Sequence, residues 1–125
     1  EHAGALALRE ALRSTMLAHT RDEPARGEAL ERAAARGELS IVFGDAGSVG
    51  IEARAAGFDG ALARLLVPAA YASLDGTWRR VKACDDDGCL EAFYDRSRNR
   101  SGRWCDMAVC GNRTKVRAYR ARREC

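Results

Sequence analysis

Four cysteines of the chain are spaced in a way that could bind a metal ion. Cys84 and Cys89 form one C-x4-C pair, and Cys105 and Cys110 form a second pair after 15 intervening residues. Structural zinc sites typically use four thiolates in a tetrahedron at roughly 2.3 Å, and each short loop can supply two of them. In a secreted chain the same cysteines could instead form disulfides. Because the sequence shows no secretory signal, we expect them to bind Zn2+.

Four further residues bear on this site. Cys125 falls outside the spacing pattern, and we expect it to be a free thiol. Asp85, Asp86 and Asp87 lie inside the first cysteine pair. A zinc ion with four thiolates has a net negative charge, which repels carboxylates. We therefore expect these three aspartates to point into solvent.

A strongly basic segment follows the cysteines. From Arg96 to Cys125, ten basic residues oppose two acidic ones, a local charge of +8 in a chain whose net charge is +3. A basic tail on an acidic body is typical of a protein that binds a polyanion, although a solvated helix has the same composition. The charge pattern alone leaves both interpretations open.

The end of this segment is predicted to form a helix with Asn112 as its N-cap. Val116 and Tyr119 would face the cysteines. The outward row would hold Arg113, Arg117 and Arg120, with Lys115 and Arg122 on another row. Like charges recur at i, i+4 in this helix and weaken it, so a metal bound at Cys110 would serve to hold its first turn.

The region before the cysteines is predicted to be rich in helix. Residues 4–20 show an amphipathic helical pattern. A second helix is expected from Asp22 as N-cap to Gly37, with Pro24 in its first turn. A third helix is expected from about Asp59, with a kink or boundary at Pro68.

A β-hairpin is predicted between the second and third helices. Ile41 and Phe43 alternate on one strand, and Ile51 lies on the next. The glycine-rich stretch between them, residues 44–50, could be compared with a phosphate-binding loop. It lacks the Gly-Lys-Ser/Thr ending and leads into a strand, so a hairpin turn is the better interpretation.

A second hairpin is predicted between the two cysteine pairs. Its strands would be Glu91–Asp95 and Arg103–Cys105, joined by a basic turn. We expect the aromatic side chains of Phe93, Tyr94 and Trp104 to cover the metal site rather than to stack on bases.

The residues around the cysteines resemble the CGNR zinc-finger family of bacterial proteins. The resemblance rests on C-x4-C, F-x-D-x-S-R-N-R and RWC-x-M-x-x-CGNR-x-K. The matching residues are Cys84, Cys89, Phe93, Asp95, Ser97 to Arg100, Arg103 to Cys105, Met107, Cys110 to Arg113 and Lys115. It implies a zinc finger that uses the four cysteines, behind a helical N-terminal domain, in proteins described as stress-induced transcription regulators. It also implies a further segment upstream of Glu1.

These observations predict an α+β fold with two domains. Residues 1–76 would form a helix-rich regulatory or dimerisation domain with a small β-hairpin. Residues 77–125 would form a treble-clef or zinc-ribbon-like four-cysteine finger that ends in a basic helix. We expect a cytoplasmic bacterial protein without a membrane partner.

The expected function is DNA-binding transcription regulation of the stress-response type. Its partners would be Zn2+, double-stranded DNA, a second copy through the N-terminal domain and an unknown small-molecule effector. The expected DNA contacts are Arg98, Arg100, Arg103, Arg113, Lys115, Arg117 and Arg120. The alternative is a zinc-stabilised protein- or RNA-interaction module without sequence-specific DNA binding. We expect no enzyme activity, because the sequence shows no nucleophile and base arrangement and four cysteines close a zinc site.

Overall fold

The computed structural model describes residues 1–123, which form two compact units. The first unit consists of Glu1–Leu12 and Arg26–Trp78, and the second of Arg13–Ala25 together with the chain from Arg79 onward. The helix α1 (His2–Arg21) contributes to both. Residues 13–25 therefore belong with the cysteine-containing unit. Cys125, the expected free thiol, lies outside the described residues.

The first two helices confirm the predicted pattern except at one end. α1 includes all of the expected helical residues, and α2 (Glu28–Arg36) ends at Gly37 as predicted. The predicted start of α2 at Asp22 is wrong. The backbone of Asp22 has a φ of 56° and its carboxylate binds Arg79, so it caps nothing.

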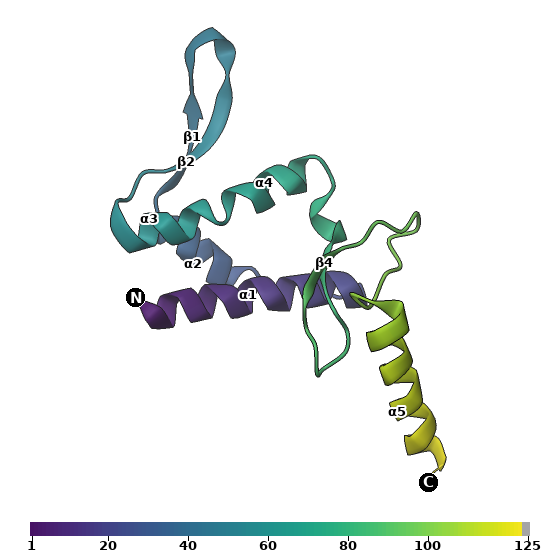
Figure 1. Cartoon of the computed structure of the whole chain (residues 1–125). Coiled ribbons are helices and arrows are strands. Elements are labelled where there is room, and N and C mark those ends of the chain that lie inside the picture. The colour runs from purple at the N-terminus through teal and green to yellow at the C-terminus, as the bar shows by residue number, and fades with distance from the viewer. Residues whose placement is uncertain (124–125) are drawn as a thin grey trace. The chain divides into compact units, whose positions relative to one another are not determined.

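The first hairpin is confirmed (Figure 1). β1 (Leu39–Phe43) and β2 (Val49–Ala53) pair antiparallel, with Ile41 opposite Ile51. The glycine-rich segment between them forms the hairpin turn. Ile41 and Phe43 lie on the same face, as the alternation predicts, and that face is exposed, with Phe43 at 81%.

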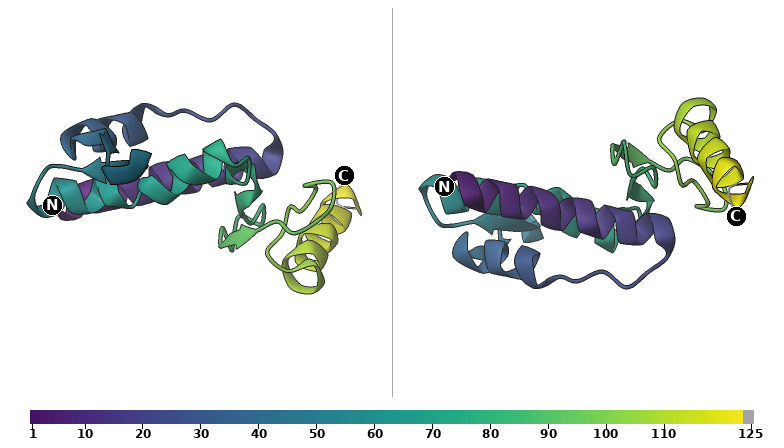
Figure 2. Two further views of the ribbon diagram at one scale, coloured as in Figure 1. Left: turned by 90° about the horizontal axis from the view of Figure 1, so that it is seen from above. Right: turned by 90° about the horizontal axis from the view of Figure 1, so that it is seen from below.

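The third predicted helix is interrupted at its proline. α3 (Gly57–Arg64) and α4 (Val67–Leu74) are separated by two residues, and Pro68 lies in the first turn of α4, where its missing N–H leaves no donor unpaired. The two helices run in roughly the same direction (Figure 2).

Small residues let the helices of the first unit approach closely. A Cβ at Gly37 would overlap that of Ala63, which is fully buried in α3. Phe58 and Leu62 of the same region lie against Gly4 at the start of α1. The core is completed by a few larger apolar side chains, among them Leu8 and Leu66.

The second unit contains the other sheet and the last helix. β3 (Val81–Ala83) pairs antiparallel with β4 (Ala92–Tyr94). The predicted strand at Arg103–Cys105 is wrong, because β4 takes β3 as its partner. The chain then forms a wide π-helical turn over Met107–Gly111, which continues into α5 (Asn112–Arg123).

The described chain therefore combines helices with two two-stranded sheets, in agreement with the α+β prediction. Among residues 1–123, the helices are all too short or too polar to cross a lipid bilayer.

Candidate metal centre

The four predicted cysteine ligands lie together in the second unit. The Sγ atoms of Cys84, Cys89, Cys105 and Cys110 are all within 4.8 Å of one another. Cys84 follows β3 directly, and its N–H donates to the carbonyl of Glu91 at 2.8 Å. The first loop is closed by the N–H of Cys89, which donates to the carbonyl of Asp86 at 2.7 Å.

The spacing of the sulfur atoms fits a tetrahedral metal site. The Sγ atom of Cys105 lies 3.6 Å from that of Cys89 and 3.8 Å from that of Cys110. A tetrahedron with metal–sulfur distances near 2.3 Å has edges of about 3.8 Å. All four cysteines are free of disulfide bonds. The donor set is the one that zinc prefers in structural sites.

The protonation of the cluster depends on a cation. Burial raises the pKa of the Cys105 thiol, and the neighbouring thiols raise it further. Burial also raises the pKa of Cys110, whereas the backbone N–H of Glu91 lowers that of Cys89. A divalent ion would reverse the preference of Cys105 and Cys110 for the neutral thiol, because it stabilises thiolates directly. Zinc bound here would supply the charge that allows all four sulfurs to ionise.

Asp86 connects the first cysteine loop to α5. Its side chain is only 1% exposed. One carboxylate oxygen accepts from Nε of Arg113 at 2.6 Å, and the other accepts from Nη2 of Arg117 and from the N–H of Gly88. Burial alone would raise the pKa of Asp86, but these hydrogen bonds outweigh burial and lower it to about 2. Asp86 is therefore ionised and holds two arginines one helical turn apart.

This arrangement corrects the expected orientation of the aspartates. Asp86 is buried, and the mostly buried Asp85 binds both Arg21 and Arg103. The prediction that these two side chains point into solvent is wrong, because guanidinium groups balance their charge. It is correct for Asp87, which is 88% exposed.

The expected faces of the last helix are also wrong. Arg113 and Arg117 turn toward Asp86 instead of forming an outward row with Arg120. Val116 and Tyr119, expected to face the cysteines, are about half exposed. The repulsion expected between arginines at i, i+4 is relieved because both share one carboxylate.

Each residue of the Cys-Gly-Asn-Arg motif has a structural role. Cys110 belongs to the cluster, and a Cβ at Gly111 would lie 2.5 Å from Sδ of Met107. Nδ2 of Asn112 donates to the carbonyl of Ala108 at 3.0 Å, within the π-helical turn. Arg113 also donates to Sγ of Cys110 at 3.3 Å, a contact that orients a metal ligand.

The helical turn that leads into α5 begins earlier than predicted. Asp106, not Asn112, is the N-cap, and its Oδ1 accepts from the N–H groups of Ala108 and Val109. The helical turn therefore begins between the two cysteines of the second pair. Asn112 lies inside the continuous helix, where its side-chain amide donates to the carbonyl of Ala108, four residues earlier.

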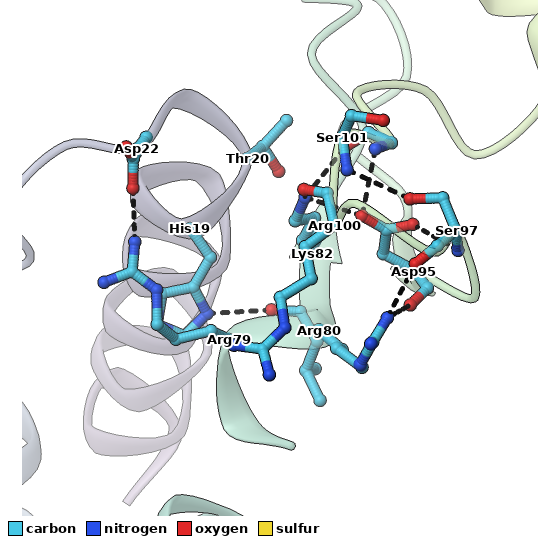
Figure 3. Close-up of polar contacts among 12 residues, drawn as sticks. His19, Thr20, Asp22, Arg79, Arg80, Lys82, Asp95, Ser97, Arg100 and Ser101 are labelled. Carbon is cyan, nitrogen blue, oxygen red and sulfur yellow. Dashed lines mark hydrogen bonds and ion pairs between the residues drawn. The ribbon is translucent and has the colours of Figure 1, made fainter. Parts of the chain in front are cut away.

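A buried lysine, which the sequence did not single out, organises the loop before the second pair (Figure 3). Nζ of Lys82 donates to Oδ2 of Asp95 at 2.7 Å and to the carbonyls of Arg100 at 2.5 Å and Gly102 at 3.0 Å. Asp95 also accepts from the N–H groups of Ser97 and Gly102 at 2.9 Å each. Burial raises the pKa of Asp95, but the lysine and these donors lower it well below its usual range. The sequence signal that could have drawn attention to Lys82 is the scarcity of lysine in this arginine-rich chain.

The predicted DNA-contacting residues fall into two groups. Arg103, Arg113 and Arg117 bind carboxylates of the same unit, so part of their charge is balanced. The others are exposed on the loop or on α5: Arg98, Arg100, Lys115 and Arg120.

A family comparison agrees with this geometry. Residues 80–123 match the family model described as CGNR zinc finger, which confirms the resemblance found in the sequence. The match includes both cysteine pairs, β3, β4 and α5. The chain has no match among curated proteins. The family match and the sulfur geometry together support zinc binding by this segment.

We expect the purified chain to contain a single zinc ion. The variant Cys105→Ser should lose this ion, because three thiolates bind zinc more weakly than four. Metal analysis after dialysis measures the content, and circular dichroism follows the helix content when a chelator is added. Cobalt substitution should give the spectrum of a tetrahedral thiolate site. A folded, metal-free chain with an unchanged spectrum would contradict the assignment.

We expect Asp86→Asn to lower the melting temperature by about 5 °C, because the amide cannot balance two guanidinium groups. Helix content should fall as α5 loosens, while zinc remains bound. Asp87→Asn is the matched control and should leave both quantities unchanged. Equal melting curves for the two variants would rule out the role of Asp86.

We expect Lys82→Met to destabilise the second unit by about 3 kcal/mol or more, because it leaves the buried Asp95 charge unpaired. Chemical unfolding of the zinc-loaded protein measures the loss. Since the pKa of Asp95 is lowered in the folded state, its contribution is present above pH ~4 and fades only as the pH falls further. A matching loss in Lys115→Met, an exposed lysine, would argue against this explanation.

Proposed function

We propose that this protein is a DNA-binding transcription regulator, in which the zinc finger presents α5 to a DNA duplex. The observation that carries this proposal is the exposure of α5, in which Thr114 alone of residues 112–123 is half-buried, together with its charge. The described helix has no buried residue and no acidic residue between Asn112 and Arg123. A helix of this kind gains little from the rest of the protein beyond its first turns, which favours a partner that surrounds it.

The dimensions and charge of α5 suit a DNA groove. An α-helix with its side chains is about 10–12 Å wide, close to the ~12 Å width of the major groove. Within residues 1–123, Lys115 and Arg120 form no ion pair, so they are available for phosphate or base contacts. Arg113 and Arg117 retain one positive charge between them, since Asp86 balances one of the two. Their role would be to orient the helix.

The loop before the second cysteine pair adds to this surface. Arg98 and Arg100 are exposed there, on a backbone that Lys82 and Asp95 fix. Contacts of this type position a protein on the duplex without reading its sequence. We also propose the treble-clef arrangement for the finger, with its hairpin and following helix around one zinc ion.

A single finger buries too little surface for operator specificity, so we propose a homodimer. The apolar side chains of Ile41, Phe43 and Val49 are exposed on the first hairpin and support an interface in the first unit. A small-molecule effector and a role in stress response belong to the same proposal. So does a cytoplasmic, bacterial setting, where thiols stay reduced and available to a metal. We assign no catalytic role, because four cysteines leave zinc without an open position.

The second candidate is a protein- or RNA-interaction module. One observation favours it: three of the seven predicted DNA contacts, Arg103, Arg113 and Arg117, bind carboxylates of the same unit. The remaining charge could then neutralise phosphates or an acidic protein without reading bases. Selection from a random duplex-DNA pool at near-physiological salt separates the two candidates. Enrichment of a short motif supports the regulator, and no enrichment supports the module.

We expect the double variant Lys115→Glu/Arg120→Glu to weaken duplex binding about tenfold or more at 0.15 M salt, since it reverses two phosphate-facing charges. Zinc content should not change. The charge-matched control Arg9→Glu/Arg32→Glu alters the first unit and should bind as the unmodified chain does. Fluorescence anisotropy with a labelled duplex gives both affinities. Equal binding by the two double variants would remove α5 from the proposed interface.

A further inference from the structure

A polar pocket of about 570 Å³ lies within the second unit, and its lining includes none of the four clustered cysteines. The end of α1, the start of the finger and the loop at residues 99–103 line it. Its volume falls in the range of small-ligand sites, roughly 300–1,000 Å³. We call it the basic pocket, because five of its lining residues are cations: Arg21, Arg79, Lys82, Arg100 and Arg103.

The basic pocket retains positive charge after its ion pairs are counted. Lys82 is bound by Asp95, and Arg21 and Arg103 share Asp85. The lining itself contains one carboxylate, Asp22, which pairs with Arg79. Asp87 also lies 3.9 Å from Arg21, so five cations and four carboxylates leave one positive charge.

Two arginines are available to a ligand. Asp22 and Arg79 are both largely exposed, so their ion pair is weak and an incoming anion can replace it at little cost (Figure 3). Arg100 makes no ion pair with residues 1–123. Guanidinium groups present paired donors that match a phosphate or carboxylate, and Asn99 and Ser101 add neutral donors at the same edge.

The backbone of the loop is held in an uncommon conformation at this place. Arg100 has a φ of 54°, in the left-handed region that non-glycine residues rarely adopt. The buried Lys82 fixes it by donating to the carbonyl of Arg100. Strained residues of this kind persist where the surroundings hold them and are concentrated at ligand sites. The position of Arg100 at the pocket is therefore built into the fold.

The lining also restricts what can bind. Its only ring is the imidazole of His19, whose Nδ1 lies 2.9 Å from the carbonyl of Val81. A lining without Phe, Tyr or Trp offers a nucleobase little stacking surface. It suits an anion surrounded by hydroxyl groups.

We propose that the basic pocket binds phosphate groups, and that it accepts a small phosphorylated compound such as a sugar phosphate. The chemistry shared with DNA is the phosphate oxyanion, which a duplex backbone could also supply. This inference stands apart from the proposed DNA binding, since a free phosphorylated compound could occupy the pocket in either case.

The test uses the zinc-loaded chain and two probes. Fructose 1,6-bisphosphate is titrated by calorimetry at 0.15 M salt, and a random-sequence duplex is titrated by anisotropy. The pocket variant is Arg79→Gln/Arg100→Gln, and Arg26→Gln is a control on an exposed arginine that does not line the pocket. Ser101→Asp serves as a second pocket variant, because it adds a negative charge without removing an arginine. Amide spectra confirm that each variant is folded.

We expect the sugar bisphosphate to bind with a Kd below about 1 mM and both pocket variants to weaken it about tenfold, with no change in Arg26→Gln. If duplex affinity stays constant, the ligand is a free compound. If instead only duplex binding falls in the pocket variants, the loss reflects the DNA contact already proposed for Arg100, and the pocket for a small phosphorylated compound is ruled out. If the pocket variants bind both probes as the control does, the proposal is wrong. A chain that binds no DNA leaves the sugar-phosphate result intact, so the two proposals fail separately.

Discussion

Buried negative charge has to be balanced throughout the second unit, because carboxylates and sulfur atoms occupy positions that water does not reach. Asp86 and Asp95 are almost fully buried, as are Cys84 and Cys110. An ionised group in such a place is costly unless a counter-charge and hydrogen bonds accompany it. The counter-charge for the aspartates comes from Arg113, Arg117 and Lys82, and a metal ion would balance the thiolates. Apart from the cysteines, the buried apolar residues described in this unit are small, Ala18 and Ala83, so charge balance has a large share in its organisation.

The same balance of charges fixes the start of α5. Cys110 and Arg113 lie one turn apart, so the cysteine cluster and the Asp86 carboxylate hold the start of α5 from two sides. The N-cap at Asp106 begins the helical turn before Cys110, within the second cysteine pair. Beyond Arg117 the helix contacts little of the protein. A helix that is fixed at its start and exposed beyond it suits the proposed binding of a partner, and that proposal would account for the cysteine pair beside an arginine-rich segment.

Much of the fold and the metal site could be predicted from the sequence, whereas the polar contacts could not. Periodicity identifies α1 and the β1–β2 hairpin, and Pro68 marks the break between α3 and α4, because these signals are local. Cysteine spacing identifies the cluster for the same reason. The strand at Arg103–Cys105 is misplaced because β3 lies equally near to β4 in the sequence and is the one that pairs with it. The inward turn of Arg113 depends on Asp86, 27 residues earlier. Neither choice of partner leaves a periodic pattern to detect.

The prediction that Asp85 and Asp86 point into solvent was wrong, because it included repulsion by the thiolates but not attraction by arginines that are close only in the folded chain. Lys82 was missed because burial of a lysine requires three acceptors, two of them backbone carbonyls that carry no sequence signal. Residues that serve charge balance are therefore the least predictable part of such a small unit.

The end of α1 has a consequence for how this protein can be divided or recombined. Oγ1 of Thr20 donates to the carbonyl of Ala83 at 2.6 Å, directly before the first cysteine, and Arg21 binds Asp85 within the first loop. Thr20 and Arg21 precede these two partners by 63 and 64 positions. A gene fragment that starts at residue 77 would encode every metal ligand and still omit this supporting turn. The family match is a contiguous stretch of sequence, whereas the compact unit that contains it is discontinuous, so a transplanted finger loses the contacts of this turn.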